Sequence, residues 1–223
     1  MQPSCIYVYF CQNKSMVKTS GLTYAYGDEQ EMRFPDIELT PGHHLLIIGP
    51  SGIGKTTLLY LMAGLLPPIK GSVAIAGKEL NALSRREIDK FRGEQIGLIF
   101  QQYHFINSLS VQDNLRLRQS ILEDAVDKQR RYQLAERLGL SDHLNKKVTQ
   151  LSQGQQQRLS IALGLIHKPK VILADEPTSN LDDANCVKVI NLLKEEAEIC
   201  KSSLVIITHD LRVMSHFQNR VEL

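Results

Sequence analysis

The sequence predicts an α/β protein with a mostly parallel sheet and a helical subdomain inserted into it. Short apolar runs alternate with helical segments along most of the chain, a pattern typical of parallel sheets covered by helices. Between Val111 and Leu144 the alternation stops, and two polar amphipathic segments take its place. The insertion is therefore expected to be helical.

The individual elements are expected where apolar runs lie between glycine, proline and polar residues. The expected strands cover residues 43–48, 72–76, 96–100, 171–174 and 204–207, and an edge strand starts at Met16. The helices beside them are expected at residues 55–65, 85–92, 183–200 and 210–216. Within the insertion, helices are expected at 111–118 and 123–138, where Val126, Leu134 and Leu138 share a face.

Length and composition restrict the function classes. The 223 residues are 43% hydrophobic, enough for one large domain or two small ones. The net charge of +2 is too mild for a nucleic-acid binder, so no nucleic-acid partner is expected. No apolar stretch approaches the roughly 20 residues of a membrane-spanning helix. Contact with a membrane is therefore expected only through a partner.

The cysteines and the first residues say less about function. Cys5, Cys11, Cys186 and Cys200 show neither zinc spacing nor a disulfide framework, which favours a reducing compartment. Residues 1–15 differ in character from the rest of the chain but have no signal-peptide pattern. Two interpretations remain open: translation starts at Met16, or residues 1–15 form an N-terminal extension.

A phosphate-binding loop comes directly after the first buried strand. Residues 49–56 match G-x-x-x-x-G-K-[ST], and glycines at these positions let backbone N–H groups converge on phosphate oxygens. Lys55 is expected to reach the β- and γ-phosphates, and Thr56 to ligate Mg²⁺. The expected nucleotide-binding residues here are Gly49, Pro50, Ser51, Gly52, Ile53, Gly54, Lys55, Thr56 and Thr57.

Two acidic residues form the second half of such a site. Asp175 and Glu176 come after the strand at 171–174, at the carboxyl end where α/β proteins bind ligands. Asp175 is expected to hold Mg²⁺, and Glu176 to orient the attacking water or accept its proton.

Further motifs resemble the ATP-binding subunits of ABC transporters. The segment 151–158 resembles the family's Leu-Ser-Gly-Gly-Gln signature, and the segments 179–182, 208–210 and 100–102 are similar to its D-loop, switch-histidine loop and Q-loop. The motifs occur in the family's order from about Thr19 to Leu223. The resemblance implies a RecA-like P-loop core with an N-terminal antiparallel β portion. It divides the chain into an extension (1–15), the first part of the core (16–102), the helical subdomain (103–150) and the remainder of the core (151–223).

The resemblance also assigns roles to individual residues. It implies that Gln101 ligates Mg²⁺ and takes part in catalysis, and that His209 contacts the γ-phosphate. Tyr26 would stack under adenine, although Tyr24 competes for this role. The residues implied to contact nucleotide across a dimer are Ser152, Gly154 and Gln155, and Asp182 of the D-loop is also implied to bind nucleotide. The signature departs from the family at Gln153, where a glycine is usual, and this change is expected to affect rate more than function.

The implied function is ATP hydrolysis coupled to transport. Two copies would close head to tail on ATP and Mg²⁺, and residues 103–110 would pass the movement to an integral membrane transporter subunit. The protein would then be cytoplasmic and peripheral on the inner face of the membrane. Segments 84–87 and 91–101 look like the lipoprotein-release, macrolide-export and cell-division group.

Two alternatives belong to other classes. A soluble ABC-type ATPase of a non-transport complex would share the motifs, but the nearly neutral charge and the single cassette argue against DNA repair, chromosome and translation proteins of this type. A small-molecule kinase would share the P-loop but leaves residues 152–155 and His209 unexplained.

Overall fold

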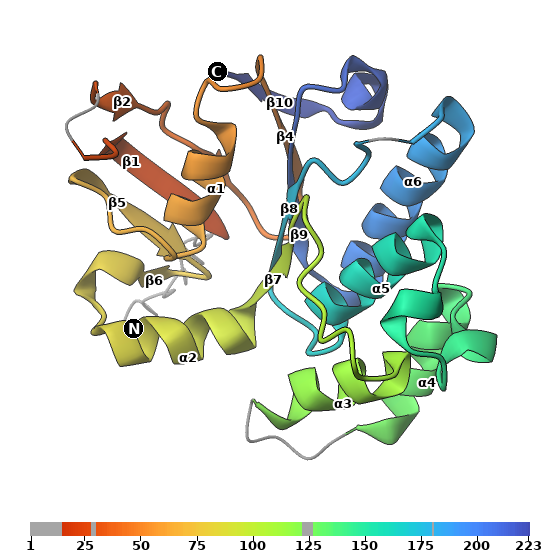
Figure 1. The fold of residues 1–223 in the computed structure, drawn as a ribbon. Helices are drawn as coiled ribbons and strands as arrows, with labels where there is room; N and C mark the ends of the chain where they lie inside the picture. The colour runs from red at the N-terminus through yellow and green to blue at the C-terminus, as the bar shows by residue number, and fades with distance from the viewer. Residues whose placement is uncertain (1–14, 28–29, 122–126, 180) are drawn as a thin grey trace, which may run out of the picture.

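A computed structural model of the chain describes residues 15–27, 30–121, 127–179 and 181–223. Two sheets and a helical region make up this part (Figure 1). The predicted parallel sheet, N-terminal antiparallel β portion and helical insertion are all present. Except for Ser15, the predicted N-terminal extension lies outside the described residues, and the predicted boundaries of the subdomains stay predictions.

The parallel sheet forms the centre of the molecule. Its order is β10-β4-β9-β8-β7, and every neighbouring pair is parallel. The strands are β4 (His44–Ile48), β7 (Ile96–Ile99), β8 (Val171–Asp175), β9 (Ser203–Thr208) and β10 (Asn219–Glu222). Four of them match predicted strands, whereas the sequence does not predict β10, because three of its four residues are polar and exposed. Only an edge strand tolerates that composition.

The antiparallel sheet contains the N-terminal strand β1 (Val17–Tyr24) at its centre. This strand pairs with β2 (Met32–Arg33), β3 (Glu38–Leu39) and β5 (Lys70–Ile75), and β5 pairs with β6 (Lys78–Glu79). The prediction of an edge strand at Met16 is therefore wrong. The alternating pattern of β1 indicates that one face of the sheet is exposed, and it does not indicate which backbone edges are paired.

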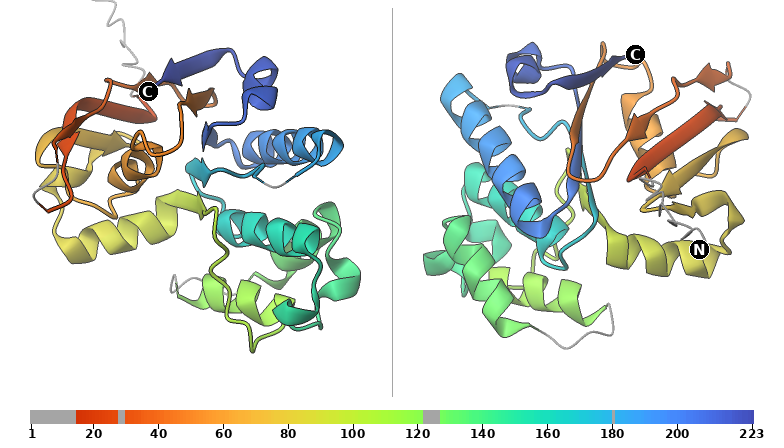
Figure 2. Two further views of the ribbon diagram at one scale, coloured as in Figure 1. Left: turned by 45° about the horizontal axis from the view of Figure 1, so that its top comes forward. Right: turned by 180° about the vertical axis from the view of Figure 1, so that it is seen from behind.

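Helices cover both faces of the parallel sheet. The helix α1 (Lys55–Met62) packs with Leu45 and Ile47 of β4 on the side of the antiparallel sheet. The helices α5 (Gln153–Leu165) and α6 (Asp183–Cys200) pack with Leu46 and Ile48 on the other side (Figures 1 and 2). The alternation of side chains along β4 thus separates two apolar cores.

The helical insertion lies between β7 and α5. It contains α3 (Val111–Ser120), α4 (Lys128–Arg137) and two 3₁₀ turns, Ser141–His143 and Val148–Gln150. The periodicity predicts that the second helix starts at residue 123, but α4 begins at Lys128. The Asp127 carboxylate caps this helix by accepting a hydrogen bond from Arg130 N at 2.8 Å. Leu134 and Leu138 are buried as predicted, whereas Val126 lies outside the described residues.

The remaining helical segments end close to their predicted positions. The helix α2 (Arg85–Gln95) starts with a capping box made by Ser84 and Glu87. The helix α1 ends three residues earlier than predicted, because Gly64 has a left-handed φ of 64° just beyond it. Residues Leu80–Ala82 and Leu211–His216 form 3₁₀ helices. Among the described residues, no helix is long and apolar enough to cross a membrane.

Candidate functional site

The phosphate-binding loop joins β4 to α1. Gly52 and Gly54 have positive φ angles of 85° and 104°, a conformation that residues with a Cβ rarely adopt. A Cβ on Gly54 would lie 3.0 Å from Met32 Sδ. Gly54 is also the N-cap of α1, so the N-terminus of this helix opens into the loop.

Lys55 is folded back against this loop. Its side chain is 6% exposed, and its ammonium group donates to Gly49 O at 2.9 Å and to Pro50 O at 2.8 Å. It also lies 3.9 Å from the Glu176 Oε1 carboxylate oxygen. The positive charge is thus buried at the mouth of the loop, between carbonyl oxygens and a carboxylate.

Thr56 and Asp175 meet at the carboxyl end of β8. The Thr56 hydroxyl donates to Asp175 Oδ2 at 2.9 Å, and Asp175 Oδ1 is buried without a hydrogen-bond partner among the described residues. Burial raises the pKa of Asp175, against the opposing hydrogen bond from Thr56. An unpartnered buried carboxylate oxygen beside a hydroxyl is a donor set that suits Mg²⁺, which prefers oxygen ligands.

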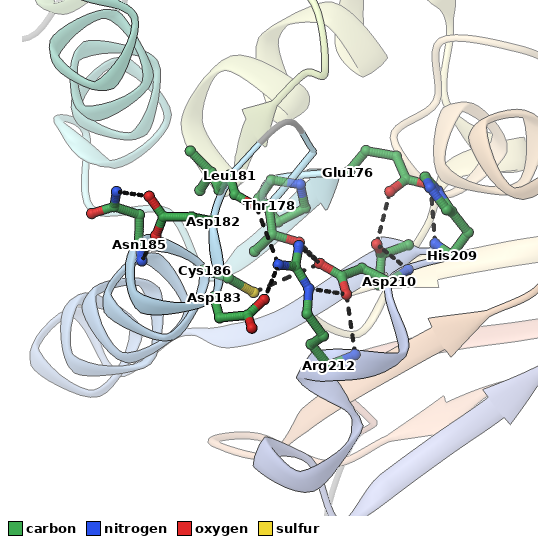
Figure 3. A network of polar contacts seen from close by, with 12 residues as sticks. Glu176, Thr178, Leu181, Asp182, Asp183, Asn185, Cys186, His209, Asp210 and Arg212 are labelled. Carbon is green, nitrogen blue, oxygen red and sulfur yellow. Dashed lines mark hydrogen bonds and ion pairs between the residues drawn. The ribbon is translucent and has the colours of Figure 1, made fainter.

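Glu176 is held by the end of the neighbouring strand β9. Its Oε2 accepts from the Thr208 hydroxyl at 2.7 Å, and its Oε1 accepts from His209 N at 3.1 Å and His209 Nδ1 at 2.7 Å (Figure 3). Glu176 itself has a left-handed φ of 48° and is 8% exposed, whereas the His209 side chain is 57% exposed. A strained backbone held by several partners is typical of functional positions.

Tyr26 offers an exposed aromatic ring beside the phosphate-binding loop. It is 43% exposed, and its hydroxyl lies 3.3 Å from Thr57 Oγ1 at the start of α1. Tyr24, the competing residue, packs partly against the core of the antiparallel sheet and meets Tyr26 edge to face at 4.9 Å. Tyr26 is therefore the more accessible of the two rings.

The signature residues begin α5. Ser152 is the N-cap, and it forms a capping box in which its backbone N–H donates to Gln155 Oε1 at 2.9 Å. Gly154 is exposed, and a Cβ there would meet no atom within 4 Å. Gln153 is exposed and lines a hollow of about 640 Å³ that it shares with the end of α4 and the start of α6. The helix start is thus open to an approaching molecule.

The signature helix is held in place by contacts of two residues, His143 and Gln157, for which the sequence suggested no role. His143 Nε2 lies 2.8 Å from Gln155 Nε2, so it ties the signature to the helical insertion. The buried Gln157 amide donates to the carbonyl oxygen of Pro177, directly after Glu176. Neither contact has a sequence signal, because each joins side chains from segments that only the fold brings together.

Gln101 lies just beyond β7 and is exposed. It lines a small cavity together with Glu176, Pro177 and Gln157. Among the described residues, no hydrogen bond joins Gln101 to Thr56 or Asp175. The structure therefore brings Gln101 close to Glu176 and not into contact with the other two predicted metal ligands.

Asp182 is the N-cap of α6. Its carboxylate accepts from Asn185 N at 2.8 Å, which lowers the pKa of Asp182.

The predicted residues thus fall into two groups. The P-loop, Asp175, Glu176 and His209 gather at the carboxyl ends of β4, β8 and β9, whereas the signature starts a helix that packs on the opposite face of the sheet from α1.

Comparisons with known proteins identify relatives of this chain. The ABC transporter family model matches residues 34–179. The lipoprotein-releasing system ATP-binding protein LolD of Legionella pneumophila (strain Lens) is 37% identical over 182 residues, covering 80% of this chain and 79% of its own. The macrolide export ATP-binding/permease protein MacB 1 of Aeromonas hydrophila subsp. hydrophila is also 37% identical, over 93% of this chain and 33% of that longer protein.

A solved structure matches the fold. The dimeric ATP-binding cassette MJ0796, in a post-hydrolysis state bound to ADP and Pi, superposes with a TM-score of 0.80 and 34% identity. The match covers 93% of this chain and 94% of that one. The chain therefore belongs to the ABC transporter family and is one of its ATP-binding, ATP-hydrolysing cassettes.

Proposed function

We propose that this cassette powers an ABC transporter by closing as a head-to-tail homodimer on two ATP molecules and by passing the movement to an integral membrane subunit. The protein would then be peripheral, on the cytoplasmic face of the membrane. One observation carries the proposal: the signature residues and the P-loop of one chain belong to helices on opposite faces of the parallel sheet. A second copy would have to bring the signature to the nucleotide.

The open start of α5 supports this assignment. Ser152, Gly154 and Gln155 form the first turn of the helix, where backbone N–H groups and the positive end of the helix dipole favour an anion. The space beside Gly154 is open to a γ-phosphate from the partner. Such contacts exist only in the closed dimer, so ATP would bind that state more tightly than the open one.

Hydrolysis is assigned to the residues around Glu176. The carboxylate would orient a water molecule and accept its proton as the water attacks the γ-phosphorus. His209 already donates to Glu176 and is exposed enough to reach the γ-phosphate. Lys55 would exchange its carbonyl partners for phosphate oxygens. Mg²⁺ held by Thr56 and Asp175, with Gln101 completing the set, would neutralise charge on the phosphates.

A groove beside the Q-loop is the proposed contact for the membrane subunit. It has a volume of about 430 Å³ and lies between the loop after Gln101 and α3. Ile106, Leu117 and Ile121 are exposed and line it. Phe105 packs partly against the core and stacks on Tyr103 at 5.3 Å, so core packing explains part of the apolar loop. The exposed residues fit an apolar helix of a partner.

The relatives favour one transporter group. LolD and MacB carry the names of lipoprotein release and macrolide export. We propose that this chain serves a membrane subunit of that group, and that the membrane subunit selects the substrate.

Complementation between two variants tests the head-to-tail site. Ser152→Arg and Lys55→Ala each damage both sites of a homodimer. In a mixed dimer of one Ser152→Arg chain and one Lys55→Ala chain, both lesions fall on the same composite site and the other site is intact. Each mixed dimer should therefore release phosphate at as much as half of the wild-type rate, and the rate of the whole mixture should rise in proportion to its content of mixed dimers. If every site were built within one chain, each would keep one lesion and mixing would restore nothing.

A further inference from the structure

Arg212 connects two segments that meet near the carboxyl end of β9. Its Nε donates to Asp210 Oδ1 and its Nη2 to Asp210 Oδ2, both at 2.8 Å (Figure 3). This fork is the geometry in which arginine binds a carboxylate most strongly. The Asp210 side chain is 11% exposed, so solvent screens the pair less than it would an exposed one.

The third nitrogen of the guanidinium reaches the segment that leads into α6. Arg212 Nη1 donates to Leu181 O at 3.2 Å and to Asp183 Oδ1 at 2.5 Å. Asp182, which the family resemblance implies binds nucleotide, lies between the two residues that Arg212 Nη1 contacts. One side chain therefore contacts both neighbours of Asp182, at the backbone carbonyl of Leu181 and at the side-chain carboxylate of Asp183.

The same network continues to the catalytic carboxylate. Asp210 Oδ2 also accepts from the Thr178 hydroxyl at 3.0 Å, and Asp210 N donates to Thr208 Oγ1 at 3.0 Å. Thr208 in turn donates to Glu176. The hydrogen bonds from Arg212 lower the pKa of Asp210 to about 2, so this carboxylate is ionised throughout the neutral range.

We infer that Arg212 is a positioning residue that holds Asp182 ready for the partner subunit and ties it to the segment that bears His209. The inference rests on the proposed head-to-tail dimer. Fixing the backbone of a residue costs conformational entropy. If Arg212 fixes the residues around Asp182 before association, the dimer does not bear that cost when it closes.

A purely structural role for Arg212 makes a different prediction. In that case its loss would lower the stability of the monomer and affect nucleotide binding and dimer closure alike. A positioning role predicts weaker dimer closure while the monomer binds nucleotide normally, because the P-loop makes no contact with Arg212 among the described residues.

The experiment uses the full chain with Glu176→Gln, which is expected to hold ATP without turnover. Arg212→Gln, Arg212→Lys and Asp183→Asn are added to it one at a time, with Arg220→Gln as the control. Arg220 is exposed, and its side chain donates locally, to Phe217 O three residues away. Light scattering gives the dimerisation constant in ATP, a fluorescent ATP analogue gives the affinity of the monomer, and thermal melting without nucleotide gives its stability.

Arg212→Gln should weaken ATP-driven dimerisation about tenfold, the equivalent of one lost charge-assisted contact. Arg212→Lys should recover only part of this loss, because an ammonium group cannot form the fork. Asp183→Asn, which removes one exposed contact, should weaken it by about threefold or less. Arg220→Gln should change nothing.

Two results overturn the inference. One is that Arg212→Gln dimerises in ATP as tightly as the Glu176→Gln parent. The other is a parallel fall in melting temperature, monomer affinity and dimerisation in Arg212→Gln and Asp183→Asn, which would make the network merely structural. If the Glu176→Gln parent itself forms no ATP-bound dimer, the proposed function fails and this inference with it.

Discussion

Replacing Glu176 by glutamine removes the proposed base while keeping the volume of the side chain. The buried carboxylate accepts three hydrogen bonds, from the Thr208 hydroxyl and from two nitrogens of His209. The amide oxygen of glutamine can still accept from His209, and the Thr208 hydroxyl can rotate to accept from the amide nitrogen. We therefore expect the variant to fold and to bind ATP.

The expected loss is in the rate of hydrolysis. A positioned general base contributes about 10²–10⁴-fold, so phosphate release should fall by about that factor. This corresponds to about 3–5 kcal/mol in the activation barrier. Lys55 loses a carboxylate at 3.9 Å but keeps its two carbonyl partners, so ATP affinity should change much less than the rate.

Steady-state phosphate release and light scattering with ATP provide the assay. The variant should accumulate as an ATP-bound dimer, whereas the wild type should return to monomers as it hydrolyses ATP. Glu79→Gln is the matched control, because Glu79 is an exposed glutamate of β6. Hydrolysis by Glu176→Gln within about twofold of the wild-type rate would refute the role of Glu176 as the base.

Three further predictions concern single side chains. Lys55→Ala should lower ATP affinity in equilibrium binding, because the buried charge that faces the phosphates is removed; unchanged affinity would take Lys55 out of the site. Gln153→Gly should dimerise with ATP at least as well as the wild type. A clear loss of ATP-driven dimerisation would show that the Gln153 side chain contributes a contact to the dimer. Burial lowers the pKa of His167 to about 4 from 6.5, so the unfolded chain takes up this proton first and stability should fall as the pH drops from 6.5 towards 4. Denaturant unfolding should show a smaller fall for His167→Gln, and an equal fall would contradict the argument.

Much of the fold and the site can be predicted from local sequence. The P-loop requires glycines at fixed offsets after an apolar strand, and Asp175 and Glu176 stand at the end of a fully buried strand. Such features depend on residues that are close together in the chain, so the local sequence pattern predicts them. The predicted start of the second insertion helix at residue 123 is wrong, because the Asp127 side chain caps the N-terminus of α4, and periodicity alone does not locate such a cap.

Other features depend on contacts between distant segments. The central place of β1, the edge strand β10 and the pairing of His143 with Gln155 arise only when the sheets and the helical insertion assemble. The fork of Arg212 on Asp210 joins near neighbours, but its reach to Leu181 requires β8 and β9 to lie side by side.

The sequence by itself therefore determined the family, the alternation of the main strands and helices of the parallel sheet, and the residues proposed to meet the phosphates. The tertiary structure decided which backbone edges are paired, which face of the sheet carries the signature helix, and which side chains hold Glu176 and Asp182 in place. The physical reason is that backbone conformation and side-chain periodicity are local properties of the chain. Pairing and positioning depend on side chains from segments that come together only in the folded protein.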